Sequence, residues 1–237
     1  MNSKLRLSIA VLLIAVMATV IGVWHHGSSA QDMVSSGMRI EMPDPEIDGG
    51  MALQRAIAQR RSIRSFADQP LELSQLGQLL WAAQGLTEDD YRASPSAGAT
   101  YPLEVFVVVG ERMHDALAAG VYQYDPAEHA ITQVRRGEVR EELARAALNQ
   151  GFLAEAPVVI AIAADYSRTT QRYGDRGRRY VHMEAGHAGQ NIYLQCQALD
   201  LGTVAVGAFN DRQVRQITAM AENLDPLYLM PIGVPRN

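Results

Sequence analysis

Two uninterrupted apolar runs constrain the fold of this chain more than any other feature of its sequence. Residues 103–109 (LEVFVVV) and 158–163 (VVIAIA) are rich in β-branched residues and contain one charge between them, Glu104. Runs of this length and composition are typical of strands that are buried on both faces of a sheet. Because 48% of the 237 residues are hydrophobic and 20% are charged, the chain can also bury a sizeable core. We therefore expect a globular domain rather than a disordered chain.

Helical periodicity alternates with these strands. Apolar residues at helical spacing predict helices over residues 73–84 and 178–199. Ser74 is a candidate N-cap of the first helix, and Gly85 is expected to end it in the left-handed conformation.

Further strands are predicted by short apolar segments that are bounded by turn residues. Residues 122–124 and 130–134 flank a turn that contains Pro126, which predicts a hairpin. Residues 203–206 and 227–232 predict two more strands near the C-terminus. Helices interleaved with apolar strands on one chain indicate a single α/β or α+β domain.

A targeting segment is predicted at the N-terminus. Lys4 and Arg6 precede a mostly apolar stretch, Leu7 to Trp24, and Ser28 and Ala30 resemble a signal peptidase site. This stretch is longer than the apolar region of most signal peptides, and it approaches the ~20 residues that span a bilayer. Both interpretations, a cleaved signal peptide and an uncleaved membrane anchor, therefore stay open. The positive-inside rule sends the body across the membrane, which predicts a location in a bacterial cell envelope, anchored or periplasmic.

These patterns divide the chain into three parts. Residues 1–30 form the signal peptide or membrane anchor, residues 31–50 a linker or an arm lying on the domain, and residues 51–237 the folded domain. The second part contains Pro43 and Pro45 and has little apolar periodicity.

Composition excludes several chemistries. Lys4 is the one lysine, so the folded body has no residue for a Schiff base or for the lysine of a P-loop. The single cysteine, Cys196, excludes a CxxC redox pair and an intramolecular disulfide. Without Lys4 and Arg6 the net charge of −5 becomes −7, because the first thirty residues contain no acid. No nucleic-acid partner is expected at this charge.

The segment RRSIRSF, residues 60–66, gathers three arginines and a serine where a helix gives way to a loop. Basic residues at this place could simply complement a helix dipole at the surface. Alternatively, Arg60 and Ser62 bind a phosphate while Arg64 reaches a second electron-rich group of the same ligand. The rigid guanidinium fork is suited to phosphate oxygens.

Two small-residue segments complement this basic one. In SPSAGATYP, residues 94–102, the side chains at 96–98 are small enough for backbone to approach a flat ligand, although a plain tight turn explains them as well. In TVAVGAFND, residues 203–211, a strand ends at Gly207 and Ala208, where exposed amides could donate hydrogen bonds to a ligand.

A metal site is a weaker alternative. His182, Glu184 and His187 share one predicted helix, but the two histidines are five residues apart rather than the four of a zinc-binding HExxH helix. Cys196 in the same helix is interpreted as a small buried hydrophobe rather than a nucleophile. No metal is therefore expected.

Taken in order, the motifs RRSIRSF, LSQLGQLLWAAQG, PSAGATYPLEVFVV, GVYQYDP, YGDRGRRYVHMEAGHAGQNIYLQCQALDLGTVAVGAF and PLYLMPIGVP resemble the nitroreductase family, and within it the SagB/ThcOx-type dehydrogenase branch. The resemblance covers residues 39–237. It implies an α+β fold with a central mixed sheet flanked by helices, and a homodimer that binds FMN near the subunit interface. The activity it implies is an FMN-dependent oxidoreductase.

The resemblance also assigns roles to individual residues. It places the flavin phosphate and pyrimidine edge at Arg60, Arg61, Ser62 and Arg64, the isoalloxazine at Pro95, Ser96, Ala97 and Gly98, and the flavin N5 edge at the backbone of Gly207 and Ala208. Arg236 stands in for a basic residue that many members carry near the last strand. Tyr101, Tyr173 and Tyr180 are candidate pocket liners, and no side chain is assigned a catalytic role.

Physical chemistry agrees with this assignment. A fixed cation such as Arg64 would stabilise the negative charge of a reduced flavin and raise its reduction potential. The expected function is transfer of hydride or electrons between a donor, with nicotinamide as one candidate, and a small-molecule or peptide-like substrate. Azoline oxidation is not expected, because the branch members that perform it use a lysine. The alternative is a membrane-tethered interaction domain, with or without flavin, that does not turn over.

Overall fold

The computed structural model describes residues 37–236, apart from 49, 89–90, 112 and 114–116. The predicted targeting segment, residues 1–30, and the start of the predicted arm therefore lie outside the described residues. Within the described part, no helix is long and apolar enough to cross a membrane.

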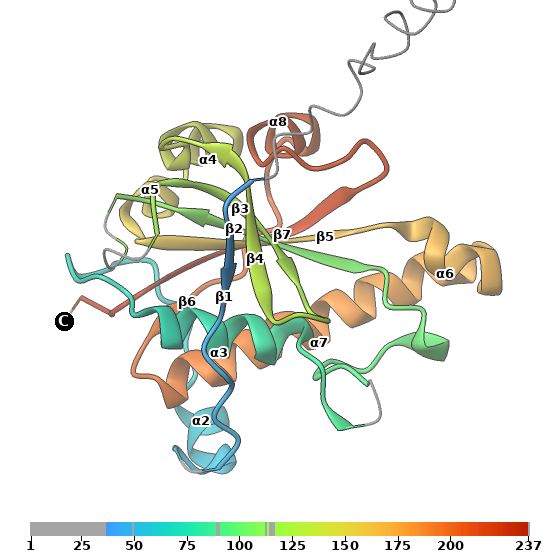
Figure 1. Ribbon diagram of the computed structural model, residues 1–237, viewed down its shortest axis with the longest axis horizontal. Coiled ribbons are helices and arrows are strands. Elements are labelled where there is room, and N and C mark those ends of the chain that lie inside the picture. Colours follow the sequence, from blue (N-terminus) through green and yellow to red (C-terminus); the bar gives the residue numbers. More distant parts are fainter. Residues whose placement is uncertain (1–36, 49, 89–90, 112, 114–116, 237) are drawn as a thin grey trace, which may run out of the picture. The chain divides into compact units, whose positions relative to one another are not determined.

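A seven-stranded sheet carries helices on both of its faces (Figure 1). The strand order is β1-β4-β3-β2-β5-β7-β6. The strands are β1 (Arg39–Glu41), β2 (Leu103–Val109), β3 (Gly120–Asp125), β4 (Ala130–Arg136), β5 (Val158–Ala164), β6 (Gly202–Thr203) and β7 (Asp225–Gly233). The helices are α2 (Leu53–Gln59), α3 (Leu73–Gln84), α4 (Arg140–Ala146), α5 (Phe152–Glu155), α6 (Tyr166–Tyr173), α7 (Arg176–Ala198) and α8 (Asp211–Ile217), and a short 3₁₀ turn covers Ala97–Ala99. The expected α+β class is confirmed.

Neighbouring strands of the sheet pair antiparallel throughout. The mixed character that we expected is limited to an isolated parallel bridge between Ser62 and Thr203, at the β6 edge. This bridge brings the predicted phosphate-binding segment against the strand that leads to Gly207.

The alternation of side chains along the strands divides the core into two layers. In β2, Leu103, Val105, Val107 and Val109 face the layer beneath α3 and α7, whereas Phe106 and Val108 face the layer beneath α4, α5 and α8. In β5 every residue is buried, so both predicted apolar runs are sandwiched between layers of helices, as their composition predicted.

The predicted arm contributes to the sheet. Residues 39–41 form the edge strand β1, which pairs with β4, and the compact unit begins at Gly37 rather than near Met51. Further along, Gln78 in α3 holds the chain at Glu46, accepting from its N–H at 2.8 Å and donating to its C=O at 3.0 Å. Backbone pairing and one buried amide thus fix a segment that has no apolar periodicity.

Helix α3 has the predicted bounds but different ends. Its N-cap is Glu72, which forms a capping box with Gln75, rather than Ser74. Gly85 follows with an extended backbone (φ −62°, ψ 157°) instead of the left-handed conformation. A Cβ at Gly85 would lie 2.3 Å from the Trp81 side chain, so the glycine is needed for close packing.

Candidate functional site

Tyr193, in the C-terminal half of α7, joins two of the three predicted site segments. The guanidinium carbon of Arg60 lies 5.0 Å from the centre of the Tyr193 ring, and the Ser62 hydroxyl lies 3.1 Å from the Tyr193 hydroxyl. The N–H of Ala205 donates to the same hydroxyl at 2.8 Å. Residues 60–62 and the chain leading to Gly207 therefore meet at one side chain, 131 residues along the sequence from Ser62.

The arginines of this segment are available for an anion. Arg60 is half-buried, while Arg61 and Arg64 are exposed. Among the described residues, no carboxylate forms an ion pair with any of the three. Arg61 instead donates from Nη1 to the carbonyl oxygens of Ala58, at 3.0 Å, and Arg60, at 2.8 Å. Uncompensated guanidinium groups side by side favour the binding of an anionic group.

Arg236 lies beside this segment. Its N–H donates to the carbonyl of Ser65 at 3.0 Å, and the preceding chain pairs with Phe66 and Ala67. Its guanidinium is 3.9 Å from Glu155, and both side chains are exposed. Such an exposed pair is weak, so it leaves Arg236 able to turn toward a stronger anion.

The loop of residues 95–98 packs on a different part of the molecule. Gly98 has a φ of +61°, and Arg172 of α6 donates to its carbonyl at 3.1 Å. A Cβ at Gly98 would lie 2.4 Å from the Tyr173 hydroxyl, so this glycine makes room for a side chain of its own chain. Tyr173 in turn contacts Tyr180 edge-on, with 5.2 Å between the ring centres.

Glu184 of α7 is a buried carboxyl behind this loop. Its side chain is 2% exposed, and its Oε1 has no hydrogen-bond partner among the described residues. Burial raises the pKa of Glu184 to about 7, against the hydrogen bond from Ser96 and the positive charge of Arg92, which lower it. The Ser96 hydroxyl oxygen also accepts from the N–H of Tyr101 at 2.9 Å, which fixes this side chain in the loop.

The two groups of predicted contacts lie apart within one chain. Glu184, which bonds the loop at Ser96, and Tyr193, which bonds Ser62, are nine residues apart on α7, or about 14 Å along the helix axis. Among the described residues, no hydrogen bond, ion pair or ring contact joins residues 95–98 to residues 60–64.

Gly207 lines a cleft of about 470 Å³, together with residues of α6, α7 and β7. A Cβ at Gly207 would come no closer than 3.9 Å to Tyr228, so the backbone is open to the cleft. In the cleft wall the Tyr166 hydroxyl is 2.5 Å from Nε2 of His182. Ala208 follows Gly207 in the sequence, and its carbonyl accepts a hydrogen bond from the side-chain amide of Gln150 at 3.1 Å.

The candidate metal ligands do not come together. His182 bonds Tyr166, whereas Glu184 is bonded by Ser96. No group of three His, Cys, Asp or Glu side chains in the described part of the chain could hold a metal ion. Cys196 is buried, and burial raises the pKa of its thiol, which agrees with its interpretation as a core residue.

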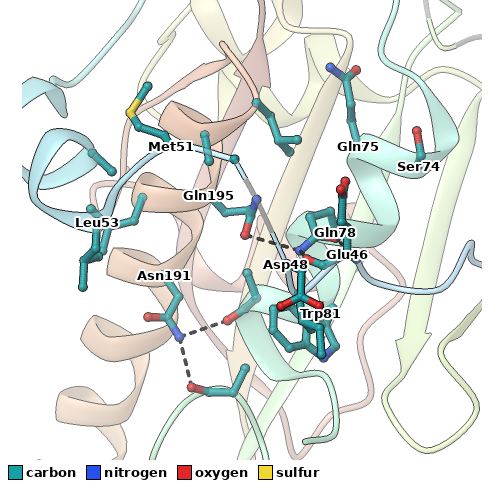
Figure 2. A pocket seen from close by; sticks show the side chains of 18 of the residues that line it. Glu46, Asp48, Met51, Leu53, Ser74, Gln75, Gln78, Trp81, Asn191 and Gln195 are labelled. Atoms are coloured by element: carbon teal, nitrogen blue, oxygen red, sulfur yellow. Dashed lines mark hydrogen bonds between the residues drawn. The ribbon is translucent and has the colours of Figure 1, made fainter.

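A separate cleft of about 640 Å³ lies between α2, α3, the C-terminal half of α7 and a stretch before α2, residues 44, 46–48 and 50–51 (Figure 2). Three of its amide side chains bond one another or nearby backbone. Asn191 donates to the carbonyls of Ala82 and Ala93, and Gln78 donates to Gln195 at 3.5 Å. None of the predicted flavin contacts lines this cleft.

Comparison with known proteins assigns the family. A model of the nitroreductase family matches residues 57–234, which include every predicted contact except Arg236. A curated protein of Methanocaldococcus jannaschii that carries a provisional nitroreductase name is 48% identical over 197 residues, or 83% of this chain and 96% of that protein. The chain belongs to the nitroreductase family.

Solved structures of this family have the same fold. A provisionally named nitroreductase of Ralstonia eutropha superposes with a TM-score of 0.75 at 29% identity, covering 86% of this nitroreductase-family chain and 92% of the other. A chain of the Escherichia coli microcin synthetase complex McbBCD, with a truncated pro-microcin bound, superposes with a TM-score of 0.68 at 22% identity, covering 84% and 78%. The second likeness shows the fold alone.

The part of this nitroreductase-family site that sequence reasoning missed is the environment of Glu184. The sequence shows an acid in a helix rich in small residues, which we weighed only as a metal ligand. The two groups that act against its burial, Ser96 and Arg92, are distant in sequence and not matched to it by any local pattern. An acidic residue on the apolar face of a helix was the available signal.

Proposed function

We propose that this nitroreductase-family protein binds FMN and transfers hydride or electrons between a donor and a small-molecule or peptide-like substrate. The observation that carries the proposal is the segment 60–64 beside the chain that leads to Gly207. There Arg60, Ser62 and Arg64 have no acidic partner in the part of the chain that the structure describes. FMN, when bound, supplies the redox chemistry, so the chain's own residues need to bind, orient and exclude water.

The residues present fit the group. A phosphate needs charge-assisted donors, and Arg60 is oriented for this task by its stacking on Tyr193. A flat ring needs open backbone, and Gly207 presents it, since the nearest atom to a Cβ there is 3.9 Å away. Arg64 would hold a fixed positive charge in the same site, and Arg236 would add a second one from the last strand.

We further propose that two copies of the chain complete the site, with FMN near their interface. Within one chain, residues 95–98 lie apart from residues 60–64. A second copy of the chain could therefore supply its own residues 95–98 to the flavin that residues 60–64 bind. Large apolar side chains on α2 and α7 are exposed, namely Leu53 (59%), Ile57 (56%) and Met183 (52%). Contact between copies would remove such side chains from water.

Membership of the SagB/ThcOx-type branch is also a proposal. It rests on the order of the motifs, and the fold likeness to a chain of the microcin synthetase is consistent with it. The body contains no lysine, so azoline oxidation through a catalytic lysine is not part of the proposal. The alternative, an interaction domain without turnover, is not favoured, because the family match spans the proposed contacts from Arg60 to Ala208.

The first test is the visible absorption spectrum of the purified protein. We expect flavin absorption bands and FMN in the supernatant after heat denaturation, because Arg60, Ser62 and Arg64 offer donors to a phosphate and Gly207 offers open backbone to a ring. Identification of the released chromophore by chromatography distinguishes FMN from riboflavin. A colourless protein that also takes up no added FMN would contradict the proposal.

We propose the cell envelope as the location, on the strength of residues 1–30. Export without a twin-arginine signal would mean that the cofactor is acquired outside the cytoplasm, because such a signal exports folded proteins. After cell fractionation we expect the protein with the membranes or in the periplasm. Recovery in the cytosolic fraction would contradict this proposal.

A further inference from the structure

Arg92 is a half-buried cation that pairs with no carboxylate among the described residues. Burial lowers the pKa of its guanidinium, against the raising effect of Glu104 and Glu184, which act at longer range. The guanidinium stacks 4.7 Å from the centre of the Tyr101 ring, and its Nη1 donates to Oε1 of Gln84 at 2.9 Å. In the described part of the chain it forms no ion pair, so Nε and Nη2 are left to donate. A partly buried charge with unmet donors favours an anionic ligand.

Gln84 presents a second unmet donor at the same place. Its side chain is the last of α3 and is 0% exposed. Oε1 accepts from Arg92, but Nε2 has no partner among the described residues. Buried side-chain donors are nearly always bonded, since each one left unbonded is destabilising, so an orphan beside a cation indicates a missing acceptor.

Both residues line a cleft of about 400 Å³ where β2 begins and β3 ends. The acidic residues of the cleft already have donors of their own. Glu104 accepts from Arg168 at 2.6 Å and from Gln123 at 3.2 Å, and Asp125 accepts from the N–H of Ala127 at 2.9 Å. Among the described residues of the cleft, the donors without an acceptor therefore include Nε and Nη2 of Arg92 and Nε2 of Gln84.

We propose that this cleft is a binding site for a small carboxylate, held by Arg92 and by Nε2 of Gln84. A planar carboxylate accepts from the guanidinium fork along the edge formed by its two oxygens and keeps other in-plane lone pairs for the amide. A single cation with two carboxylates in the same wall disfavours a dianion such as phosphate. The volume admits a carboxylate with a small substituent. The flavin contacts that the resemblance implies do not include these two residues.

The test is a titration of the full-length protein, labelled with ¹⁵N, with acetate, benzoate and inorganic phosphate at constant ionic strength. The signals to follow are the side-chain amide of Gln84 and the Nε–H of Arg92. We expect saturable shifts with the carboxylates, and weaker binding of phosphate. Neither flavin nor turnover enters the measurement, so its outcome is independent of the proposed function.

Three variants make the test specific. Arg92→Met should lower the affinity for the carboxylates at least tenfold, whereas Arg212→Met, which removes an exposed arginine of α8, should leave it unchanged. Gln84→Glu places a carboxylate next to Arg92 inside the chain, so it should abolish binding and raise the melting temperature. If Arg92→Met does not fold, Gln84→Glu still tests the proposal.

The proposal is overturned by any of three results. These are the absence of a saturable shift, an unchanged affinity in both Arg92→Met and Gln84→Glu, and tighter binding of phosphate than of either carboxylate.

Discussion

Replacing Arg60 and Arg64 together by alanine is expected to strip FMN from the purified protein. A hydrogen bond to a charged group contributes about 1.5–3 kcal/mol, so losing one guanidinium contact at each position should weaken binding by about 3–6 kcal/mol. This corresponds to a Kd raised roughly 10²- to 10⁴-fold. The measurement is the FMN content after gel filtration, followed by titration of the apoprotein with FMN.

The matched control removes the same charge elsewhere. Arg136 and Arg212 are exposed and make no side-chain contact that the structure describes. The double variant Arg136→Ala, Arg212→Ala should therefore retain FMN at the level of the parent. Full retention of flavin in the Arg60, Arg64 variant would refute the proposed site. Equal loss of flavin in both double variants would show that the loss follows from the lower net charge rather than from contacts at Arg60 and Arg64.

The sequence marks this segment as a candidate site but does not indicate which side chains it contacts. Arginine and serine at close spacing mark residues 60–64 in the sequence itself. That Tyr193 would orient Arg60 and bond Ser62 depends on α7 crossing beneath the loop, a long-range contact with no local pattern. Motif spacing thus predicts which residues gather, and packing decides what orients them.

The fold was predictable where apolar periodicity is strong. The strands 103–109 and 158–164 and the helix 73–84 follow from it, because burial on one or two faces selects the residues there. The edge strand 39–41 was not predictable, because three residues held by backbone hydrogen bonds leave no side-chain pattern. Helix α6 was not predicted either, because Thr169 is its one buried side chain and the helix therefore has no apolar periodicity.

Buried polar groups are the least predictable part of this molecule. In the described part of the chain, Glu184, Gln84 and Thr203 each bury an atom without a partner. Apart from the place of Glu184 on the apolar face of its helix, the neighbouring sequence does not distinguish them from solvated residues. Their environments come from segments that are remote along the chain. For Glu184 the consequence is large enough to measure, because a carboxyl group with a pKa near neutrality links folding to pH.

The stability of the protein is expected to fall as the pH rises from about 4.5 to 7, with Glu184 as a main cause. The unfolded carboxyl ionises near its ordinary value of 4.5, whereas burial in the folded chain raises the pKa to about 7. Across this interval the folded state binds more protons than the unfolded state, so the free energy of unfolding decreases with pH. At ~1.4 kcal/mol per pKa unit, the loss is about 3 kcal/mol by pH 8.

Glu184→Gln should remove this loss. An amide has the shape of the protonated carboxyl and still accepts from Ser96, so the variant should match the parent near pH 4.5 and exceed its free energy of unfolding by about 3 kcal/mol at pH 8. Denaturant unfolding at a series of pH values measures the difference, and taking the difference cancels the acid-range contributions of Glu138 and Asp165, whose pKa values are lowered. Glu222→Gln, at an exposed carboxyl, is the control and should leave the profile unchanged. Parallel profiles for the parent and Glu184→Gln would show that this carboxyl ionises in the folded chain as it does in water.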